Sequence, residues 1–376
     1  MGQTQGQAVA IILNYTPHGW GTREDFLLRL CSGFIRHGLP TVLISSEVIH
    51  SSTAASYLSA GVFLEVVNCE KNHIRAWHQL GTIFKKYQVT TAYLRFFNYS
   101  QVVSWMVFSH GLRRLVFAEA TSGVLTSCRW RRVLLAGRAM VTTFPITKAI
   151  AISKFVKRQL TKLGVPDHKL LVVYNGVNTN RFAPSHDARQ RLASSLEIAN
   201  EEIIISTASR LTSLKHPEVI IDACGLLIKE GLPIRLLVAG EGELQTALEE
   251  QVRNIGIVER VCFLGSVANL EGILQASDIF VLASVGEAFG YVIAEAMACG
   301  VPVVGSRSGA IEEIVEHGKT GLLAEPLDSA SFAASMRSLA VDKSLRERMG
   351  AAGLVRARLQ FTVEETVKET VRICMS

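Results

Sequence analysis

Residues 287–304 of this chain read EAFGYVIAEAMACGVPVV. The stretch holds two carboxylates, Glu287 and Glu295, among residues that are otherwise apolar or small. It passes through the turn Gly300-Val301-Pro302 into a β-branched run. A helix that leads through a tight turn into a short buried strand is typical of a parallel sheet covered by helices.

The spacing of the two glutamates also suits an elongated ligand. If a helix starts just after Glu287, Glu295 lies about 12 Å further along its axis, at about 1.5 Å per residue. That is roughly the span from the hexose to the ribose of a sugar nucleotide. Carboxylates so placed accept hydrogen bonds from hydroxyls at both ends of one ligand. The alternative is a helix with one exposed and one half-buried glutamate.

Short apolar runs alternate with amphipathic segments on both sides of this stretch, which predicts an α/β chain of two doubly wound Rossmann-like domains facing each other across a cleft. With 376 residues, two domains are also the expectation from length. We place the first domain at 1–180, the second at 181–355, and a C-terminal helix at 356–376 that packs back on the first domain. The predicted strands are 8–13, 41–45, 62–67, 91–95, 115–118, 149–152, 170–174, 203–208, 234–239, 261–264, 279–283 and 301–304.

The net charge of +6 conceals an asymmetry. Residues 1–180 hold 20 basic and 7 acidic side chains, a charge of +13, whereas the remainder holds 19 and 26, a charge of −7. A cationic first half predicts an anionic partner. Its densest cluster, Arg129, Arg131, Arg132 and Arg138, interleaves with Trp130 and leucines, as in a helix that lies on an anionic membrane surface. A solvated basic face is the alternative, and nucleic acid is not expected because no binding motif accompanies the charge.

The chain contains no apolar run of about 18 residues, so no transmembrane helix is expected. Its N-terminus lacks a basic segment before the first short apolar run, which argues against a secretory signal. Seven scattered cysteines without C-x-x-C spacing favour free thiols in a reducing compartment. We therefore expect a cytoplasmic protein, with peripheral membrane contact as an option. The ten histidines show no metal-type spacing, and no metal is expected.

Arg210 and Lys215 follow the predicted strand 203–208. Two cations five residues apart, on a loop that enters a helix, can neutralise a diphosphate with the help of helix N-terminal amides. They would stabilise the charge that grows as a glycosidic bond breaks. The alternative is a pair of exposed surface cations.

Three further positions are candidates for a close approach of backbone to a nucleotide. Gly21 lies between the first strand and first helix, Gly240 ends the strand 234–239, and Leu264 precedes the glycine that ends the strand 261–264. The alternative is an ordinary strand-to-helix turn, which has the same composition. Gly21 does not belong to a G-x-G-x-x-G fingerprint, and the chain has no G-x-x-x-x-G-K-[ST] loop.

Taken together, these segments resemble the retaining glycosyltransferases of family 4, which have the two-domain GT-B fold. The resemblance covers about residues 149–325, is looser over the first 40 residues, and is nearly absent over 46–148. The segments that carry it are AISKFVK (151–157), VYNGVNTNRFAP (173–184), SRLTSLKHPE (209–218), LLVAGEGELQ (236–245), VCFLGSV (261–267), ASDIFVLAS (276–284) and 287–323.

The resemblance implies that the first domain, 1–180, binds the acceptor and the second, 181–355, the donor. It implies that Arg210 and Lys215 hold the diphosphate of a nucleoside-diphosphate sugar, most simply a UDP-sugar. It implies that Glu287 faces the transferred sugar and Glu295 the ribose. Such enzymes retain the anomeric configuration by front-face attack, with the departing phosphate taking the acceptor proton, and they use no cofactor and usually no metal.

It further implies that the amides of Phe289 and Gly290 touch the sugar, and that Gly21 approaches the phosphate and acceptor. Relatives often carry a histidine at the end of a first-domain strand. Here that strand reads LVFAEATSG, with Glu119 and Ala120 at its end. Glu119, His110 and Trp20 are our acceptor-side candidates.

The sequence thus predicts a sugar transfer from a nucleotide donor to an acceptor hydroxyl, on a lipid-linked molecule, a glycan or a natural product. A sugar-nucleotide epimerase or a sugar phosphorylase on the same fold is an alternative. A non-catalytic nucleotide-sugar binder is another, because the first-domain histidine is missing.

Overall fold

A computed structural model describes residues 7–17, 21–97, 102–119 and 143–376 of the chain. The chain divides into two compact units. Unit 1 comprises Met1–Asn175 and Val363–Ser376, and unit 2 comprises Gly176–Thr362. The boundaries drawn from sequence, at residues 180 and 355, differ from these by a few residues. Unit 2 extends beyond residue 355 because its last helix, Lys343–Gln360, continues to Gln360.

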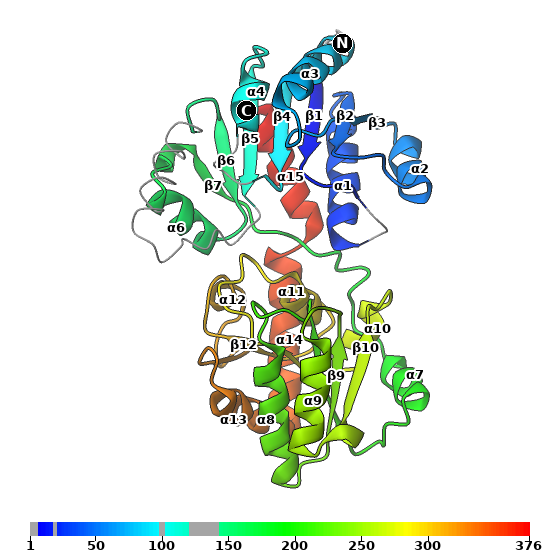
Figure 1. Cartoon of the computed structure of the whole chain (residues 1–376). Helices are drawn as coiled ribbons and strands as arrows, with labels where there is room; N and C mark the ends of the chain where they lie inside the picture. The colour runs from blue at the N-terminus through cyan, green and yellow to red at the C-terminus, as the bar shows by residue number, and fades with distance from the viewer. Residues whose placement is uncertain (1–6, 18–20, 98–101, 120–142) are drawn as a thin grey trace. The chain divides into compact units, whose positions relative to one another are not determined.

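Unit 1 is built on a parallel sheet with the strand order β3-β2-β1-β4-β5-β6-β7 in its described part (Figure 1). The central strands are buried along their whole length, as expected for a sheet covered on both faces. The strands are β1 (Ala8–Leu13), β2 (Thr41–Ser45), β3 (Phe63–Val66), β4 (Val89–Arg95), β5 (Arg114–Glu119), β6 (Lys148–Ala151) and β7 (Leu170–Val172).

Two helices from opposite ends of the chain form one face of unit 1. The last helix, α15, packs beside α1 (Figure 1), and both contribute to one apolar cluster with β1, β2, β4 and β5. Gly33 permits this close packing, since an added Cβ would lie 3.1 Å from Val367 and from Val371. The helices of unit 1 are α1 (Thr22–Arg36), α2 (Ser51–Ser59), α3 (His73–Tyr87), α4 (Val103–Phe108), α6 (Lys154–Lys162) and α15 (Val363–Met375).

Unit 2 repeats the design, with the strand order β10-β9-β8-β11-β12-β13. Every pairing in it is parallel. The strands are β8 (Ile203–Ala208), β9 (Ile234–Ala239), β10 (Val261–Gly265), β11 (Ile279–Leu282), β12 (Val303–Ser306) and β13 (Gly321–Ala324).

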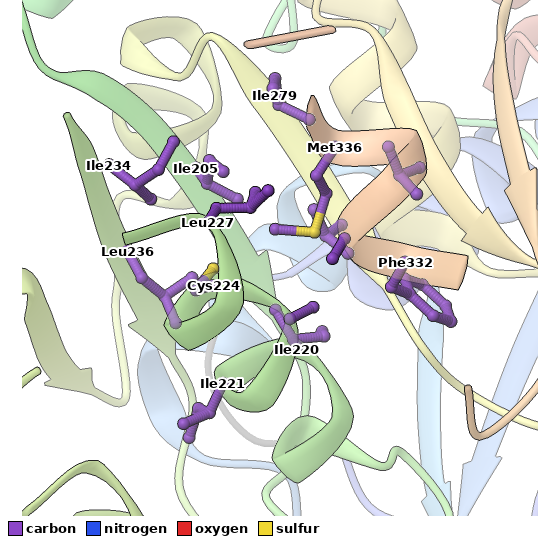
Figure 2. Close-up of a cluster of buried hydrophobic side chains, with 14 of the residues drawn as sticks. Ile205, Ile220, Ile221, Cys224, Leu227, Ile234, Leu236, Ile279, Phe332 and Met336 are labelled. Carbon is purple, nitrogen blue, oxygen red and sulfur yellow. The ribbon is translucent and has the colours of Figure 1, made fainter. Parts of the chain in front are cut away.

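One apolar core of unit 2 lies between the sheet and α8, α9 and α13. Figure 2 shows Ile220, Cys224 and Leu227 of α8 among strand residues and Met336 of α13. Burial of this kind contributes roughly 25 cal/mol per Å² of apolar surface. The helices are α7 (Ala188–Ser195), α8 (Pro217–Lys229), α9 (Gln245–Ile255), α10 (Leu270–Ala276), α11 (Tyr291–Ala298), α12 (Ile311–Ile314), α13 (Ser329–Val341) and α14 (Lys343–Gln360).

The predicted fold class is confirmed, because both units are doubly wound parallel sheets. Residues 356–376, predicted as one helix that packs back on the first domain, hold the end of α14 at Gln360 and then α15, which packs on α1. The break arises because Phe361 leaves the helical conformation. The strand β13 was not foreseen. It is four residues long and starts with Gly321, which gives no strand signal.

Candidate functional site

The strand order of unit 2 reverses between β8 and β11, which pair directly. In such sheets, ligands bind outside the carboxyl ends of the strands at this switch point. The loop after β8 carries Arg210 and Lys215, and the loop after β11 carries Glu287. Residues predicted from separate motifs therefore stand on the two loops that flank one switch point.

Lys215 and Glu287 bridge these two loops. The Nζ atom of Lys215 donates to Oε2 of Glu287 over 2.6 Å. Both side chains are largely withdrawn from solvent, with 22% and 18% of their surface exposed. An ammonium has three donors, so Lys215 can hold Glu287 and still bind a phosphate oxygen. The pair fixes both charges at the switch point before a ligand arrives.

Arg210 lies at the rim of a pocket of about 460 Å³. Its side chain is exposed, so its guanidinium is available to an anion. The pocket is formed by the ends of β8, β9 and β10 with Val292 of α11, and a volume of this size suits a small ligand. Its lining residues are Ala208, Ser209, Arg210, Ala239, Gly240, Glu241, Ser266, Val267, Leu270 and Val292.

Gly240 is required where two of these loops touch. Its φ is +130°, and a Cβ at this position would lie 1.9 Å from the carbonyl oxygen of Ser209. The contact is reinforced by hydrogen bonds from Leu211 N to Glu241 O and from Ser266 N to Oε1 of Glu241. The backbone at the ends of β8, β9 and β10 is thereby held as one surface.

The loop that carries Glu287 is fixed from the β12 side. The amide of Gly286 donates to Oγ of Ser308, and the amide of Ala310 donates to the carbonyl of Glu287. A Cβ on Gly309 would lie 2.6 Å from the Glu287 backbone, so the two loops are in direct contact. The turn at 308–310 therefore positions Glu287, a role that its sequence had not suggested.

The condition behind the 12 Å estimate, a helix that starts just after Glu287, is not met. The helix α11 begins at Tyr291 rather than just after Glu287, because Gly290 takes a left-handed conformation with φ +89°. Only four residues of helical rise, about 6 Å, then separate Tyr291 from Glu295. Glu295 is 2% exposed and lies inside unit 2. Phe289 is equally buried, and its ring meets that of Phe361 at 5.8 Å between centroids.

Leu264 is not among the described residues that line the pocket around Gly240. It lines a second pocket of about 650 Å³ with residues of α7 and α10. The pocket residues Ser266, Val267 and Val292 were missed from sequence. An apolar side chain at a pocket wall has the same pattern as one in the core, so only the glycine at 265 marked this region.

The candidates of unit 1 are dispersed. Gly21 is the N-cap of α1, and Glu119 ends β5 at the carboxyl edge of the sheet, where it is 5% exposed. His110 precedes β5 and so lies at the opposite edge. It stacks on Trp77 at 5.0 Å and its Nε2 lies 3.1 Å from the carbonyl of Trp77. Burial lowers the pKa of His110. Its contacts give it a packing role.

Some candidate residues lie outside the part of the chain that the structure describes, and two expected absences concern all of the described residues. Trp20, Ala120 and the basic cluster from Arg129 to Arg138 lie outside the described residues. No described helix is long and apolar enough to cross a membrane. Within residues 7–17, 21–97, 102–119 and 143–376, no group of three or more His, Cys, Asp or Glu side chains is arranged to hold a metal ion.

Residues 188–356 match the family described as glycosyl transferases group 1. The match lies within unit 2 and includes Arg210, Lys215 and Glu287. The match supports the assignment of a glycosyltransferase, and it covers the unit that carries the switch-point residues. Unit 1 is not part of it.

Curated relatives agree with this match. The chain is 32% identical to the N-acetyl-alpha-D-glucosaminyl L-malate synthase of Bacillus anthracis over 219 residues, 58% of this chain and 57% of that protein. It is 32% identical to the D-inositol 3-phosphate glycosyltransferase of Corynebacterium urealyticum over 225 residues, 57% of this chain and 53% of that protein. The chain thus spans little more than half the length of these relatives.

Solved structures resemble the chain over nearly its whole length. Anabaena Alr3699/HepE, solved in complex with UDP, has a TM-score of 0.83 at 20% identity and covers 97% of this chain and 99% of that one. The glycosyltransferase WaaG has a TM-score of 0.73 at 15% identity, with 97% and 99% covered. At such identities the likeness shows the fold alone, which is that of GT-B glycosyltransferases.

Proposed function

We propose that this protein transfers a sugar from a nucleoside-diphosphate sugar, most simply a UDP-sugar, to an acceptor hydroxyl, with retention of the anomeric configuration. The observation that carries the proposal is the ion pair of Lys215 and Glu287 at the switch point of unit 2. It sets a cation for the diphosphate beside a carboxylate for sugar hydroxyls. The neighbouring pocket offers backbone and apolar surface to a nucleoside.

In this proposal Arg210 and Lys215 bind the diphosphate. Arg210 stands at the pocket rim, and Lys215 lies two residues before Pro217, the first residue of α8. As the bond between the anomeric carbon and the diphosphate oxygen breaks, negative charge grows on the leaving group. Two cations on the loop after β8, of which Lys215 is held by Glu287, stabilise that charge more than the charge of the bound donor. The reaction accordingly needs no metal for this step.

Glu287 is proposed to accept hydrogen bonds from the hydroxyls of the transferred sugar, aided by the amides of Phe289 and Gly290. The acceptor oxygen forms its bond to the anomeric carbon on the face from which the diphosphate departs. The proton of the acceptor hydroxyl passes to the departing diphosphate, so no protein nucleophile is needed. Glu295 is assigned to the ribose, although only 2% of its surface is exposed.

The comparisons support the donor half of this proposal. The family match covers the proposed donor residues, and a structural neighbour of the same fold was solved with UDP-glucose. The names of two curated relatives specify L-malate and D-inositol 3-phosphate, which are small hydroxylated acids. An acceptor hydroxyl on a compact molecule is therefore one option, beside a glycan or a lipid-linked acceptor.

The test is incubation of the full chain with a panel of sugar nucleotides, with and without acceptors, followed by mass determination of the products. Transfer or slow donor hydrolysis is expected, with the anomeric configuration of the product read by proton NMR. An interconverted sugar nucleotide would indicate an epimerase, and phosphorolysis a phosphorylase. Nucleotide binding by calorimetry without any product would indicate a non-catalytic binder and would contradict the proposal.

Peripheral association with an anionic membrane from the cytoplasmic side is a further part of the proposal. It rests on the charge of +13 over residues 1–180. Sedimentation with liposomes should require anionic lipid and weaken with salt. Sedimentation independent of lipid charge would refute it.

A further inference from the structure

Unit 1 has its own switch point, between β1 and β4. These strands pair up to their last residues, Leu13 opposite Arg95. Tyr15 follows the first strand and Phe96 follows the second. Their rings meet edge to face, with centroids 4.9 Å apart and an interplanar angle of 86°. The position where a doubly wound sheet binds ligands thus carries an aromatic pair.

Arg23, in the first turn of α1, rests on this pair. Its guanidinium carbon lies 5.3 Å from the centroid of the Tyr15 ring and 5.9 Å from that of Phe96. Two aromatic faces restrict the side chain while leaving its donors accessible, because Arg23 is exposed. No ion pair joins Arg23 to a carboxylate among the residues that the structure describes.

The nearest carboxylates on α1 are directed elsewhere. Asp25 accepts from Nε of Arg29 over 2.9 Å. Oε2 of Glu24 lies against the backbone of Gly21, 3.2 Å from where a Cβ would stand. A second guanidinium, that of Arg95, lies 5.1 Å from the Phe96 ring and is buried among polar and aromatic neighbours. Other carboxylates stand nearby: Glu70 accepts from Nδ2 of Asn14, the residue before Tyr15, and Glu119 is buried at the end of the neighbouring strand β5. Arg23 is the exposed cation that rests on the two rings.

The backbone of Phe96 is held in an unusual conformation. Its φ is +66°, a left-handed value that a bulky residue rarely adopts. Phe96 directly follows Arg95, whose side chain donates to Tyr93 and Asn175. These contacts fix the chain at the point of strain. Strain of this kind at a strand end is typical of residues that are placed for a ligand.

We infer that Arg23, Tyr15 and Phe96 form an acceptor subsite for a carboxylate or phosphate group. The inference rests on the proposed glycosyl transfer and specifies its acceptor class as anionic. A planar guanidinium seated on two rings binds a carboxylate or phosphate through paired hydrogen bonds. The anionic group lies on the acceptor molecule and remains unreacted. The hydroxyl that attacks belongs to the same molecule.

The test is an NMR titration of arginine Nε–H signals in the full chain, saturated with UDP so that the anion site of unit 2 is occupied. The probes are inorganic phosphate, L-malate, glycerol 3-phosphate and dihexanoyl phosphatidic acid, with glycerol as the neutral counterpart. The Arg23 signal should move saturably with the acidic probes and remain still with glycerol. The soluble acids and the short-chain lipid distinguish a free acid from a lipid headgroup as the natural source.

Three variants sharpen this test. Arg23→Gln should weaken binding of the acidic probes about tenfold or more, and Arg23→Lys should weaken it less, since the charge remains. Arg113→Gln is the matched control, an exposed arginine of unit 1 that precedes β5 at the other edge of the sheet. It should bind the probes as the unaltered protein does.

The outcomes separate this inference from the proposed function. A protein that binds UDP and turns over a donor, but shows no saturable Arg23 shift with any acid, overturns the inference alone. A saturable shift together with no turnover of any sugar nucleotide overturns the proposed transfer and leaves the anion site standing. Equal weakening by Arg23→Gln and Arg113→Gln would also overturn the inference, because it would indicate a non-specific charge effect.

Discussion

The first six strands of unit 1 have the same order as the six strands of unit 2, yet the switch points of the two units are built differently. In unit 2, charged side chains on two loops pair across the β8–β11 boundary, and Gly240 brings backbone against backbone. In unit 1, the β1–β4 boundary carries the rings of Tyr15 and Phe96, with Arg23 seated on them. One fold thus offers a polar site with fixed charges and an aromatic site with one restrained cation.

This difference explains why the sequence predicted the site residues of unit 2 but not those of unit 1. A site that depends on glycines and on charges at fixed loop positions constrains the identity of each residue. A site made of aromatic rings and one arginine requires only that a ring contacts a cation. It leaves the identity and the sequence position of each residue open. We propose that the first arrangement serves an invariant nucleotide and the second a variable acceptor. The following predictions test that division, from the largest expected effect on activity to the smallest.

Lys215→Ala should have the largest effect, because it removes a cation from the diphosphate and leaves Glu287 without its partner. We expect kcat/KM to fall about 10²- to 10³-fold, with donor hydrolysis falling in parallel. Lys229→Ala, an exposed lysine at the end of α8, is the control and should leave both rates unchanged. Loss of less than a few-fold in Lys215→Ala would remove Lys215 from the proposed machinery.

Gly240→Ala should separate the loops of unit 2. Its Cβ would stand 1.9 Å from the oxygen of Ser209, so the backbone must move. UDP affinity should fall about tenfold or more, and the free energy of unfolding should fall by about 1–3 kcal/mol. Gly256→Ala tests positive φ alone, since no atom lies within 4 Å of its Cβ. Calorimetry should find UDP binding unchanged in that control, and equal losses in both variants would contradict the steric account.

Phe96→Leu should affect only the acceptor side. Removing one ring beneath Arg23 should weaken binding of L-malate or glycerol 3-phosphate about two- to fivefold, the magnitude of an exposed cation–π contact. Donor hydrolysis should be unchanged. Phe63→Leu is the control, since Phe63 lies on β3 and is 45% exposed. A parallel loss of UDP affinity in Phe96→Leu would break the division between the units.

Glu202→Gln should leave activity intact, because Glu202 precedes β8 at the edge opposite to the site. Burial raises the pKa of Glu202, but hydrogen bonds from Arg235, with help from Arg260, outweigh it and lower the pKa below 4.5. The carboxylate therefore stabilises the fold above about pH 4.5, and this stabilisation is lost as the pH falls through the lowered pKa.

Urea unfolding between pH 7 and pH 3 measures this effect. The gap between the unaltered protein and Glu202→Gln should be about 1–3 kcal/mol at pH 7 and should close in acid. Glu230→Gln breaks an exposed pair with Arg337 and should shift the midpoint less. A gap that persists unchanged at pH 3 would refute the assignment of this stability to the Glu202 carboxylate.

The strands of unit 2 and several of its site residues could be predicted from the sequence for a physical reason. Its strands are continuous apolar runs, and β8 and β9 have the bounds that their composition predicts. Arg210, Lys215 and Glu287 stand on the loops that follow β8 and β11, so topology alone brings them to one edge. The helix α11 begins at Tyr291, directly after Gly290, whose left-handed conformation no periodicity reveals.

The site inferred in unit 1 could not be read in this way. Tyr15 and Phe96 stand 81 positions apart and meet only because Leu13 pairs with Arg95 in the sheet. The register of two strands and the orientation of α1 decide that contact. Arg23, Tyr15 and Phe96 were therefore absent from the sequence-based candidates, whereas His110, which was among them, lies at the opposite edge.

The most direct test of the central claim is a crystal structure of the full chain with a bound UDP-sugar. The account predicts the diphosphate within hydrogen-bonding distance of Arg210 and Lys215, the sugar hydroxyls at Glu287, and the uridine in the pocket beside Gly240 and Ser266. A UDP-sugar bound elsewhere on unit 2, or on unit 1, with Lys215 and Glu287 still paired only to each other, would contradict it.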